Sequence, residues 1–346
     1  MYQNYKVVVN TAAGRRRYMQ YLIPYVLASD IVDRYDLWIN TMNCQDIAFF
    51  NEISNKYPKL NLIWQPDGEV NGNKSINAFY KQCTDEDTIY FKLDDDIIWM
   101  ENGLIEKMIK FRLDNPQYFL VTPLVINNSL TTYLFQVNNK IQLQTYYKSS
   151  ASHEILWKSG KFALDLHNWF LNNYLLQNKI DCLHLGGAKP MGMTRFSINA
   201  ILWFGKEMKK FNGIVPGDDE EFLSCIYPTK QGLANCWNGD AIVSHFAFFT
   251  QREFLDKEHI LERYGDYLQK YWENDKIANK VFSDINIIME QIDTNKIELP
   301  PAPYKQIVHD EPYMSVAKMK QKMIQLIPHS IFCKLKDKKV NSKKYI

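Results

Sequence analysis

Residues 88–96 read TIYFKLDDD, a run of β-branched, aromatic and apolar residues that ends directly in three carboxylates. Such residues pack well on a pleated surface, so Thr88–Leu93 is predicted to form a β-strand. Runs of the same kind occur on both sides of it in the chain, at Tyr5–Asn10, Tyr35–Asn40, Leu60–Trp64 and Tyr118–Val125.

Stretches with a helical spacing of apolar residues separate these predicted strands. They lie at Arg15–Ser29, Asp46–Tyr57, Ser75–Cys83 and Leu104–Asn115. Strands that alternate with helices predict an α/β fold, with a mostly parallel sheet that helices cover on both faces. Ligands of open α/β sheets bind at the carboxyl ends of the strands. We therefore expect a binding site in the residues that follow each run.

The composition narrows the class of protein. The chain has 346 residues, 46% hydrophobic and 23% charged, as in ordinary globular proteins. A net charge of +2 gives no field that recruits nucleic acid, so no nucleic-acid partner is expected. The six cysteines form no CxxC pair, which fits a reducing compartment. The N-terminus lacks the apolar core of a signal peptide, and no stretch approaches the roughly 18 apolar residues of a spanning helix. We therefore expect a cytoplasmic protein.

The triplet Asp94–Asp96 is the first candidate site. Adjacent carboxylates repel one another, and a cation among them offsets that cost. A hard divalent ion such as Mn²⁺ or Mg²⁺ meets this need. Alternate side chains of an extended chain point the same way, so Asp94 and Asp96 are expected to face one centre. The alternative is a solvated acidic turn.

A second acidic cluster, GDDEE at residues 217–221, lies far downstream. The helix dipole favours acids in a first turn, so part of this cluster is expected to mark the start of a helix. Four acids exceed that need, and a positioned carboxylate can take the proton of an attacking sugar hydroxyl. The two clusters thus predict a division of labour between metal binding and base catalysis.

His245 lies in a third informative segment, the strand-like run Ala241–Phe249. Two interpretations remain open for it. The imidazole is either a hydrogen-bonded core group or a ligand that joins two carboxylates on a metal ion.

The order of these motifs resembles a GT-A glycosyltransferase, most similar to the family 2-type enzymes of bacterial surface-polysaccharide synthesis. The resemblance covers about residues 5 to 250. It rests first on a strand with a basic turn at Val7–Arg15, a downstream acid at Asp46 and a Lys…Asn segment at Lys74–Asn77. It rests further on a DXD-type triplet at Asp94–Asp96 and a late acidic motif at Asp218–Phe222. The stretch Asn127–Phe196 matches no motif of the family and is expected to shape acceptor specificity. Its Trp157, His167 and Trp169 are expected either to contact a sugar or to pack in the core.

The resemblance implies a role for each candidate residue. Asp219 takes the position of the catalytic base, and Asp218 replaces the glutamate that usually stands beside it. The implied metal ligands are Asp94, Asp96 and His245. The implied contacts to the nucleotide-sugar are Thr11, Arg15, Asp46, Asn77, Asp94 and Asp95.

The expected function is an inverting, metal-dependent transfer of a sugar from a nucleoside-diphosphate-sugar donor to a glycan or lipid-linked acceptor, with Mn²⁺ or Mg²⁺ as cofactor. One alternative is a metal-dependent nucleotidyltransferase, which should carry a glycine-rich phosphate loop with a lysine near the first strand. The turn Thr11–Arg16 has one glycine and no lysine. A second alternative is a catalytically inactive carbohydrate-binding protein of the same fold.

Four segments are expected along the chain. Residues 1–126 form the nucleotide-sugar-binding half of the GT-A domain, residues 127–250 the acceptor-binding half, residues 251–300 a helical extension and residues 301–346 a linker and basic amphipathic tail. From Met314 to Ile346 there are nine lysines and one acid. With the apolar stripe Val316, Met319, Met323 and Leu326, this predicts a helix bound to an anionic membrane, at the inner face of the plasma membrane. A solvated disordered tail and a partner-binding helix are the alternatives.

Overall fold

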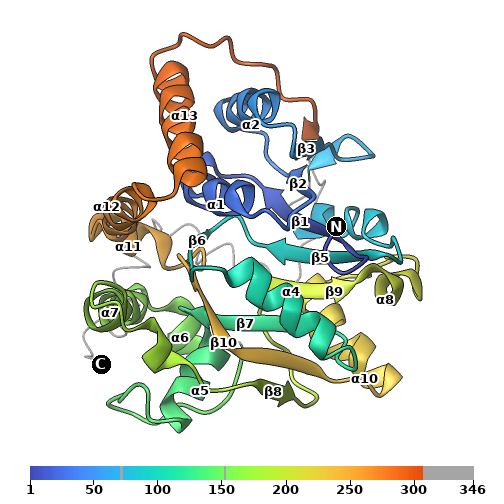
Figure 1. Ribbon diagram of the computed structural model, residues 1–346, viewed down its shortest axis with the longest axis vertical. Helices are drawn as coiled ribbons and strands as arrows, with labels where there is room; N and C mark the ends of the chain where they lie inside the picture. The colour runs from blue at the N-terminus through green and yellow to red at the C-terminus, as the bar shows by residue number, and fades with distance from the viewer. Residues whose placement is uncertain (71–72, 152, 307–346) are drawn as a thin grey trace, which may run out of the picture.

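The computed structural model describes residues 1–70, 73–151 and 153–306. One curled sheet lies at the centre of this part of the chain (Figure 1). The strand order is β3-β2-β1-β5-β9-β7-β10-β6, and β8 pairs with β10 beside this path. A second, two-stranded sheet pairs β4 with β11. The strands are β1 (Lys6–Ala13), β2 (Arg34–Ile39), β3 (Leu60–Ile63), β4 (Glu69–Val70), β5 (Thr88–Leu93), β6 (Ile97–Met100), β7 (Val121–Ile126), β8 (Ala188–Met191), β9 (Ala200–Phe204), β10 (Asn235–His245) and β11 (Lys305–Gln306).

Most of the central strands run in parallel. β1 is parallel to β2 and β5, and β7 is parallel to β10. β9 lies antiparallel between β5 and β7, so those two strands share one direction. The carboxyl ends of β1, β2, β5, β7 and β10 therefore lie at one edge of the sheet. The predicted α/β class, with a mostly parallel sheet flanked by helices, is confirmed.

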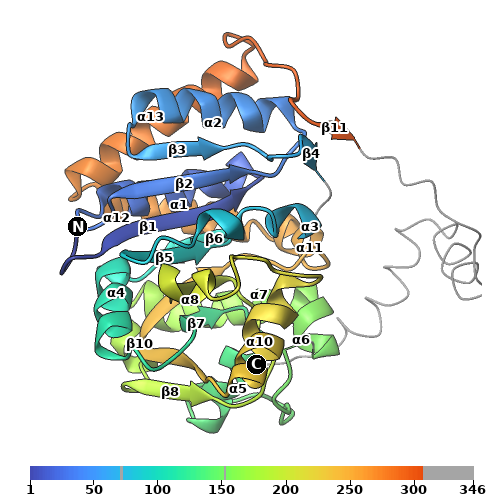
Figure 2. The ribbon, with the colours of Figure 1, turned by 90° about the vertical axis from the view of Figure 1, so that its right-hand side faces the viewer.

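Helices pack on both faces of the sheet, and Figure 2 shows the strands stacked between β3 and β8. Successive residues of β1 enter different hydrophobic clusters, because side chains alternate along a strand: Val7 and Val9 enter one and Val8 the other. The principal helices are α1 (Arg16–Ala28), α2 (Cys44–Lys56), α4 (Leu104–Asp114) and α13 (Lys276–Asp293) around the first cluster, and α5 (Ser129–Val137), α7 (Gly160–Phe170), α8 (Gly205–Lys209) and α12 (Ile260–Trp272) around the second.

Several shorter elements connect this framework. A 3₁₀ turn at Tyr80–Gln82 precedes β5, and another at Ile180–Leu183 precedes β8. Two helices, α7 and α9, run on through wider turns at Leu171–Leu175 and Phe222–Ile226. The short helices are α3 (Asn73–Ile76), α6 (Glu154–Lys158), α9 (Asp219–Glu221), α10 (Tyr227–Gln231) and α11 (Arg252–Lys257).

Three of the differences between the observed and the predicted elements bear on the site. β5 has the predicted bounds, but β1 continues past Asn10 to Ala13, so Thr11 lies inside the strand. The predicted helix at Ser75–Cys83 is wrong, because this stretch holds only the end of α3 and a 3₁₀ turn. The late strand begins earlier than predicted and ends at His245. That last difference places His245 at the carboxyl edge.

The segment after β10 is helical, as predicted, through α11, α12 and α13. α13 packs against α1 and α2, and Asp284 of α13 accepts hydrogen bonds from Lys56 at 2.8 Å and Tyr57 at 2.6 Å. The predicted amphipathic tail helix, residues 313–327, lies outside the described residues. Among the helices that are described, none has the length and apolar character needed to cross a membrane.

Candidate functional site

Most of the predicted site residues lie at the carboxyl edge of the sheet. Arg15 follows β1, the triplet follows β5 directly, and His245 ends β10. The strand pairing explains why they are close in space, because β1 lies beside β5 and parallel strands end at the same edge.

Arg15 binds two carboxylates of the triplet. Its guanidinium donates from Nε to Asp95 Oδ2 at 2.9 Å, from Nη2 to Asp95 Oδ1, and from Nη2 to Asp96 Oδ2 at 3.0 Å. The Gly14 N–H also donates to Asp95, and Arg252 lies 3.4 Å from Asp96 Oδ2. Asp95 and Asp96 are buried, so these donors compensate two desolvated negative charges. Burial acts to raise the pKa of Asp96, but Arg15 and then His245 outweigh it and hold that pKa well below its usual value.

Asp96 and His245 have the geometry of two ligands to one ion. Asp96 Oδ1 lies 3.4 Å from His245 Nε2, and His245 Nδ1 lies 3.4 Å from the carbonyl oxygen of Asn127. Nε2 can donate to Asp96 when it carries the proton; when Nδ1–H instead donates to the Asn127 carbonyl, the Nε2 lone pair can join Asp96 on a shared cation. Ligands about 2.1 Å from a divalent ion lie about 3 Å from each other, so this pair fits Mn²⁺ or Mg²⁺.

Asp94 faces away from this pair. Its carboxylate accepts hydrogen bonds from Lys92 Nζ and, at 3.1 Å, from Asn199 Nδ2. Among the described residues, the ligand atoms of Asp94, Asp96 and His245 do not come together within the span of a single ion. Only part of the predicted metal set is therefore assembled, and the role of Asp94 as a ligand stays a prediction.

The second acidic cluster begins α9, as predicted. Asp218 is its N-cap, accepting from the Glu221 N–H at 2.9 Å, and Arg195 bonds both Asp218 and Glu220. Asp219 is half-buried and accepts a hydrogen bond from the Tyr80 hydroxyl at 2.9 Å. Capping thus accounts for Asp218, while Asp219 keeps a separate environment.

Lys92 lies between the two acidic clusters. It is buried on β5, and its ammonium donates to Asp94 and, at 3.0 Å, to the carbonyl oxygen of Ile198. Burial alone would lower the pKa of Lys92, but Asp94 and Asp219 raise it above its usual value. For Asp219, burial raises the pKa, and the nearby Lys92 partly opposes that shift. One buried cation therefore lies close enough to act on both clusters.

The remaining predicted nucleotide contacts lie in different surroundings. Thr11 is buried, and its hydroxyl shares a 3.0 Å hydrogen bond with Tyr35. Asp46, in the first turn of α2, accepts from the Arg16 N–H at 3.1 Å, and burial raises its pKa. Asn77 donates to the carbonyl oxygen of Gly217 at 2.7 Å. Asn77 thus adjoins the second cluster, and the donor contacts of these three residues stay predictions.

Some functional candidates escaped the sequence analysis. Lys92, Tyr80, Asn199 and Arg195 contact the acidic clusters from scattered positions. Lys92 carried a usable signal, since a lysine in an otherwise apolar strand beside three acids must find a carboxylate partner. The other three carried none, because their positions depend on β9 lying next to β5 and on the turn before β5.

Two of the three residues predicted for sugar contact or core packing belong to the core. His167 is buried, with Nδ1 3.0 Å from the Tyr264 hydroxyl and Nε2 2.8 Å from the Phe246 carbonyl oxygen. Burial lowers its pKa to about 4, so it is neutral near pH 7. Trp169 packs against Phe135 and Tyr174. Trp157 is only half-buried.

Comparisons with known proteins identify no family for this chain. No protein-family model and no curated protein matches it. Among solved structures, CMP:2-keto-3-deoxy-manno-octonic acid synthetase in complex with CTP matches with a TM-score of 0.38 and 10% identity. The match covers 75% of the present chain and 99% of the synthetase. At this degree of similarity it carries no argument about ligand or reaction.

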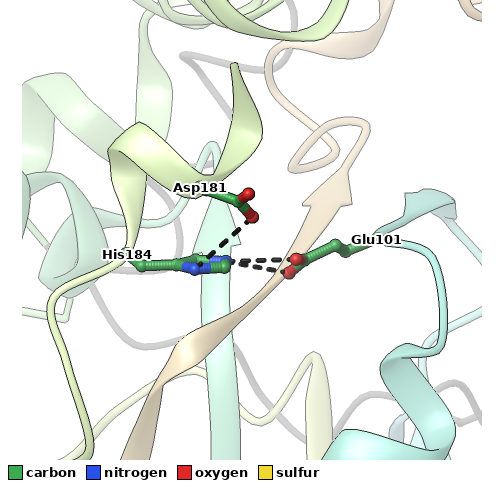
Figure 3. A group of neighbouring side chains, drawn as sticks. All are labelled: Glu101, Asp181 and His184. Atoms are coloured by element: carbon green, nitrogen blue, oxygen red, sulfur yellow. Dashed lines mark hydrogen bonds and ion pairs between the residues drawn. The ribbon is translucent and has the colours of Figure 1, made fainter. Parts of the chain in front are cut away.

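A second group with metal-binding residue types lies away from the triplet, at Glu101, Asp181 and His184 (Figure 3). His184 Nε2 lies 3.1 and 3.2 Å from the two Glu101 oxygens, and its Nδ1 lies 3.7 Å from Asp181. Glu101 also accepts from Lys107 at 2.6 Å and from the Ile242 N–H at 3.2 Å. His184 and then Lys107 outweigh the effect of burial and lower the pKa of Glu101. Because protein donors already satisfy Glu101, this group fits an internal ion pair better than a metal site.

Proposed function

We propose that the chain is a metal-dependent glycosyltransferase, which moves a sugar from a nucleoside-diphosphate-sugar donor to a hydroxyl of a glycan or lipid-linked acceptor. The observation that carries the proposal is the approach of Asp219 to the triplet through Lys92. Lys92 of β5 donates to Asp94, and Asp219 is near enough to raise its pKa, so two acidic groups from distant parts of the chain lie near the strand that ends in the triplet. One group suits a phosphate-bound ion, and the other suits proton transfer.

The donor diphosphate is proposed to bind beside the triplet. Arg15 and Arg252 are partly exposed and already gather around Asp96, so their remaining donors can meet phosphate oxygens. Within the described residues, Arg252 Nε is buried and has no hydrogen-bond partner. A buried donor without a partner is costly, and a phosphate oxygen would satisfy it.

The proposed ligands of the ion are Asp96 and His245, with phosphate oxygens completing its coordination. When bound, a divalent ion neutralises the charge that develops on the departing nucleoside diphosphate. Arg15 also bonds the other oxygen of Asp96, which orients that carboxylate toward His245.

Asp219 is the proposed base. Its carboxylate takes the proton from the acceptor hydroxyl as that oxygen forms a bond to the anomeric carbon. The bond from the anomeric carbon to the diphosphate oxygen breaks on the opposite face, and the electron pair leaves with the diphosphate, so the configuration inverts. Burial raises the pKa of Asp219, which makes it a stronger base than an exposed aspartate. The Tyr80 hydroxyl orients one oxygen of this carboxylate.

The alternative function is that of a nucleotidyltransferase. The reaction products distinguish a glycosyltransferase from a nucleotidyltransferase. The purified chain with Mn²⁺, a panel of nucleoside-diphosphate sugars and methyl glycosides should release nucleoside diphosphate and form a disaccharide. The same chain with nucleoside triphosphates and free sugars should release no pyrophosphate. Pyrophosphate release with formation of a nucleotide-sugar would replace the proposed function by the alternative. If neither set of products forms, the catalytically inactive carbohydrate-binding protein is favoured.

We also propose a place for the reaction in the cell. A cytoplasmic enzyme of surface-polysaccharide synthesis that acts on lipid-linked acceptors needs access to the membrane surface. The lysines between Met314 and Ile346 supply a cationic segment suited to anionic lipids. The chain is therefore proposed to be peripheral at the inner face of the plasma membrane.

A further inference from the structure

A small cavity lies between α5, β8 and β10 in the second half of the chain. It has a volume of about 170 Å³. Its walls combine flat or apolar side chains with hydroxyl groups, and they include Leu130, Tyr133, Ser149, Met191, Thr194 and Trp237. Neither acidic cluster lines it, so the cavity is distinct from the site described above.

The aromatic walls of the cavity are held in place. Trp237 is only 8% exposed and packs on Phe196, with 6.2 Å between ring centroids. Tyr133 meets Tyr146 edge to face, and Tyr146 donates to the Tyr133 hydroxyl at 3.4 Å. Tyr146 is 64% exposed, which is unusual for so large a ring. The indole of Trp237 and the ring of Tyr133 are the aromatic surfaces among the lining residues, and either could contact a flat ligand.

Two short connections join this cavity to the proposed catalytic residues. Thr194, in one wall, directly precedes Arg195, which bonds Asp218 and Glu220 on either side of Asp219. The opposite wall belongs to α5. Its N-cap Asn128 donates to Asn199 Oδ1 at 3.1 Å, and Asn199 in turn donates to Asp94. Sequence adjacency and a chain of hydrogen bonds thus connect the walls of the cavity with both acidic clusters.

We propose that this cavity binds one pyranose ring of the acceptor saccharide. The role of this sugar as the acceptor rests on the proposed function. The binding of a sugar ring in the cavity does not depend on that function. A pyranose has an apolar C–H face for Tyr133 or Trp237 and hydroxyls for Ser149 and Thr194. The volume of about 170 Å³ is several times the roughly 30 Å³ that one water occupies in the liquid, so the cavity can hold a ligand larger than water.

The test is a direct binding measurement without nucleotide or metal. Saturation-transfer NMR with methyl β-glycosides of glucose, galactose and N-acetylglucosamine should give signals on ring protons of at least one glycoside. Tyr133→Ala should weaken that binding about tenfold, or about 1.4 kcal/mol. Thr194→Val, which keeps shape but removes the hydroxyl, should weaken it less. Tyr267→Ala is the matched control, because Tyr267 is a half-buried tyrosine of α12 stacked on Tyr271, outside this cavity.

Each result decides between the two proposals. Binding that Tyr133→Ala weakens about tenfold and Tyr267→Ala preserves supports the subsite, even if no transfer activity is found. Equal binding by Tyr133→Ala and wild type, or no binding of any glycoside, overturns it. Release of nucleoside diphosphate from donor and water is measured in parallel. If that release persists in Tyr133→Ala while glycoside binding is unchanged, the subsite is wrong and the proposed function stands. Thermal unfolding of each variant identifies any loss of fold, and Tyr133→Leu, which keeps an apolar side chain but removes the ring, then replaces Tyr133→Ala.

Discussion

Lys92 sits in β5 among apolar and aromatic neighbours, where an unpaired ammonium would be very unfavourable. Asp94 and the carbonyl oxygen of Ile198 satisfy it, and Asp219 contributes at longer range. The positive charge of Lys92 therefore interacts with both acidic clusters. Its removal should affect both clusters together.

The first prediction is that Lys92→Met destabilises the fold by about 1–3 kcal/mol, the cost of a buried polar group left without its partner. Asp94→Asn in the same chain should recover part of this loss, because the uncompensated charge is removed. A double-mutant cycle of urea unfolding measures the coupling. Simple additivity of the two substitutions would show that Lys92 and Asp94 do not interact.

Asp219 gives the second prediction, which concerns pH. The base works only when ionised, and burial raises its pKa above the usual value. Activity should therefore fall as the pH drops through that raised pKa, at a higher pH than for an exposed aspartate. Asp219→Asn should lower kcat by roughly 100-fold or more with little change in donor affinity.

The pH profile of kcat/KM and a donor-binding titration check this prediction for Asp219. Loss of nucleotide binding with an unchanged kcat at saturation would make Asp219 a donor contact. The base would then have to be Asp218, Glu220 or Glu221.

The third prediction concerns the pair Asp96 and His245. If Asp96 and His245 hold the ion, His245→Ala should weaken Mn²⁺ binding about tenfold or more in the presence of nucleoside diphosphate. His184→Ala is the matched control, because His184 belongs to the second group, which the Lys107 ammonium already neutralises. Calorimetric titration with Mn²⁺ measures both. Binding that depends on His184 and not on His245 would place the ion at Glu101.

At the scale of elements, β9 acts directly on the site. It pairs with β5 and β7 in the antiparallel sense, and Asn199 just before it reaches Asp94. The start of α9 has a comparable influence, since the Asp218 cap fixes the turn that carries Asp219. The long strands thus bring the site residues to the carboxyl edge, and the short elements at that edge orient their side chains.

The start of α2 provides the fourth prediction. Asn43 caps this helix by accepting from the N–H groups of Gln45 and Asp46 at 2.9 and 3.1 Å. Asn43→Ala should lower the free energy of unfolding by about 1 kcal/mol, and Asn43→Ser should restore most of it. Thermal or urea unfolding compares the two variants. Equal stability of Asn43→Ala and wild type would show that the cap contributes nothing measurable.

At the scale of the whole molecule, a lysine-rich segment, residues 314–346, follows the described α/β fold along the chain. The stripe Val316, Met319, Met323 and Leu326 is short, so apolar burial alone should bind a bilayer weakly. The lysines should supply much of the attraction, and salt screens that part.

Removal of residues 313–346 is the fifth prediction. The truncated chain should stay folded and active on soluble acceptors but lose sedimentation with anionic liposomes. The full chain should bind these liposomes at low salt, release them at high salt, and ignore neutral ones. Equal sedimentation of both chains would contradict a membrane role. Unfolding on truncation would show that the stripe packs in the core.

Local sequence patterns were sufficient for the fold class, for β5 with its bounds, and for acidic groups at strand ends. Each of these depends on hydrophobic periodicity and residue type within a few neighbours. Asp218 and Asp219 were likewise recognised as a helix start, because capping preferences act locally.

Only the tertiary structure decided which distant groups meet. Nothing in the local pattern shows that β9 lies between β5 and β7, so the contact of Asp94 with Asn199 was not predictable, whereas that of Lys92 with a neighbouring carboxylate was. The same holds for the burial of His167 against Tyr264 and for the cavity beside Tyr133. Local periodicity reports which face of an element is apolar. The strand order depends on the packing of the whole chain. That order determines which residues lie next to each buried charge in this protein.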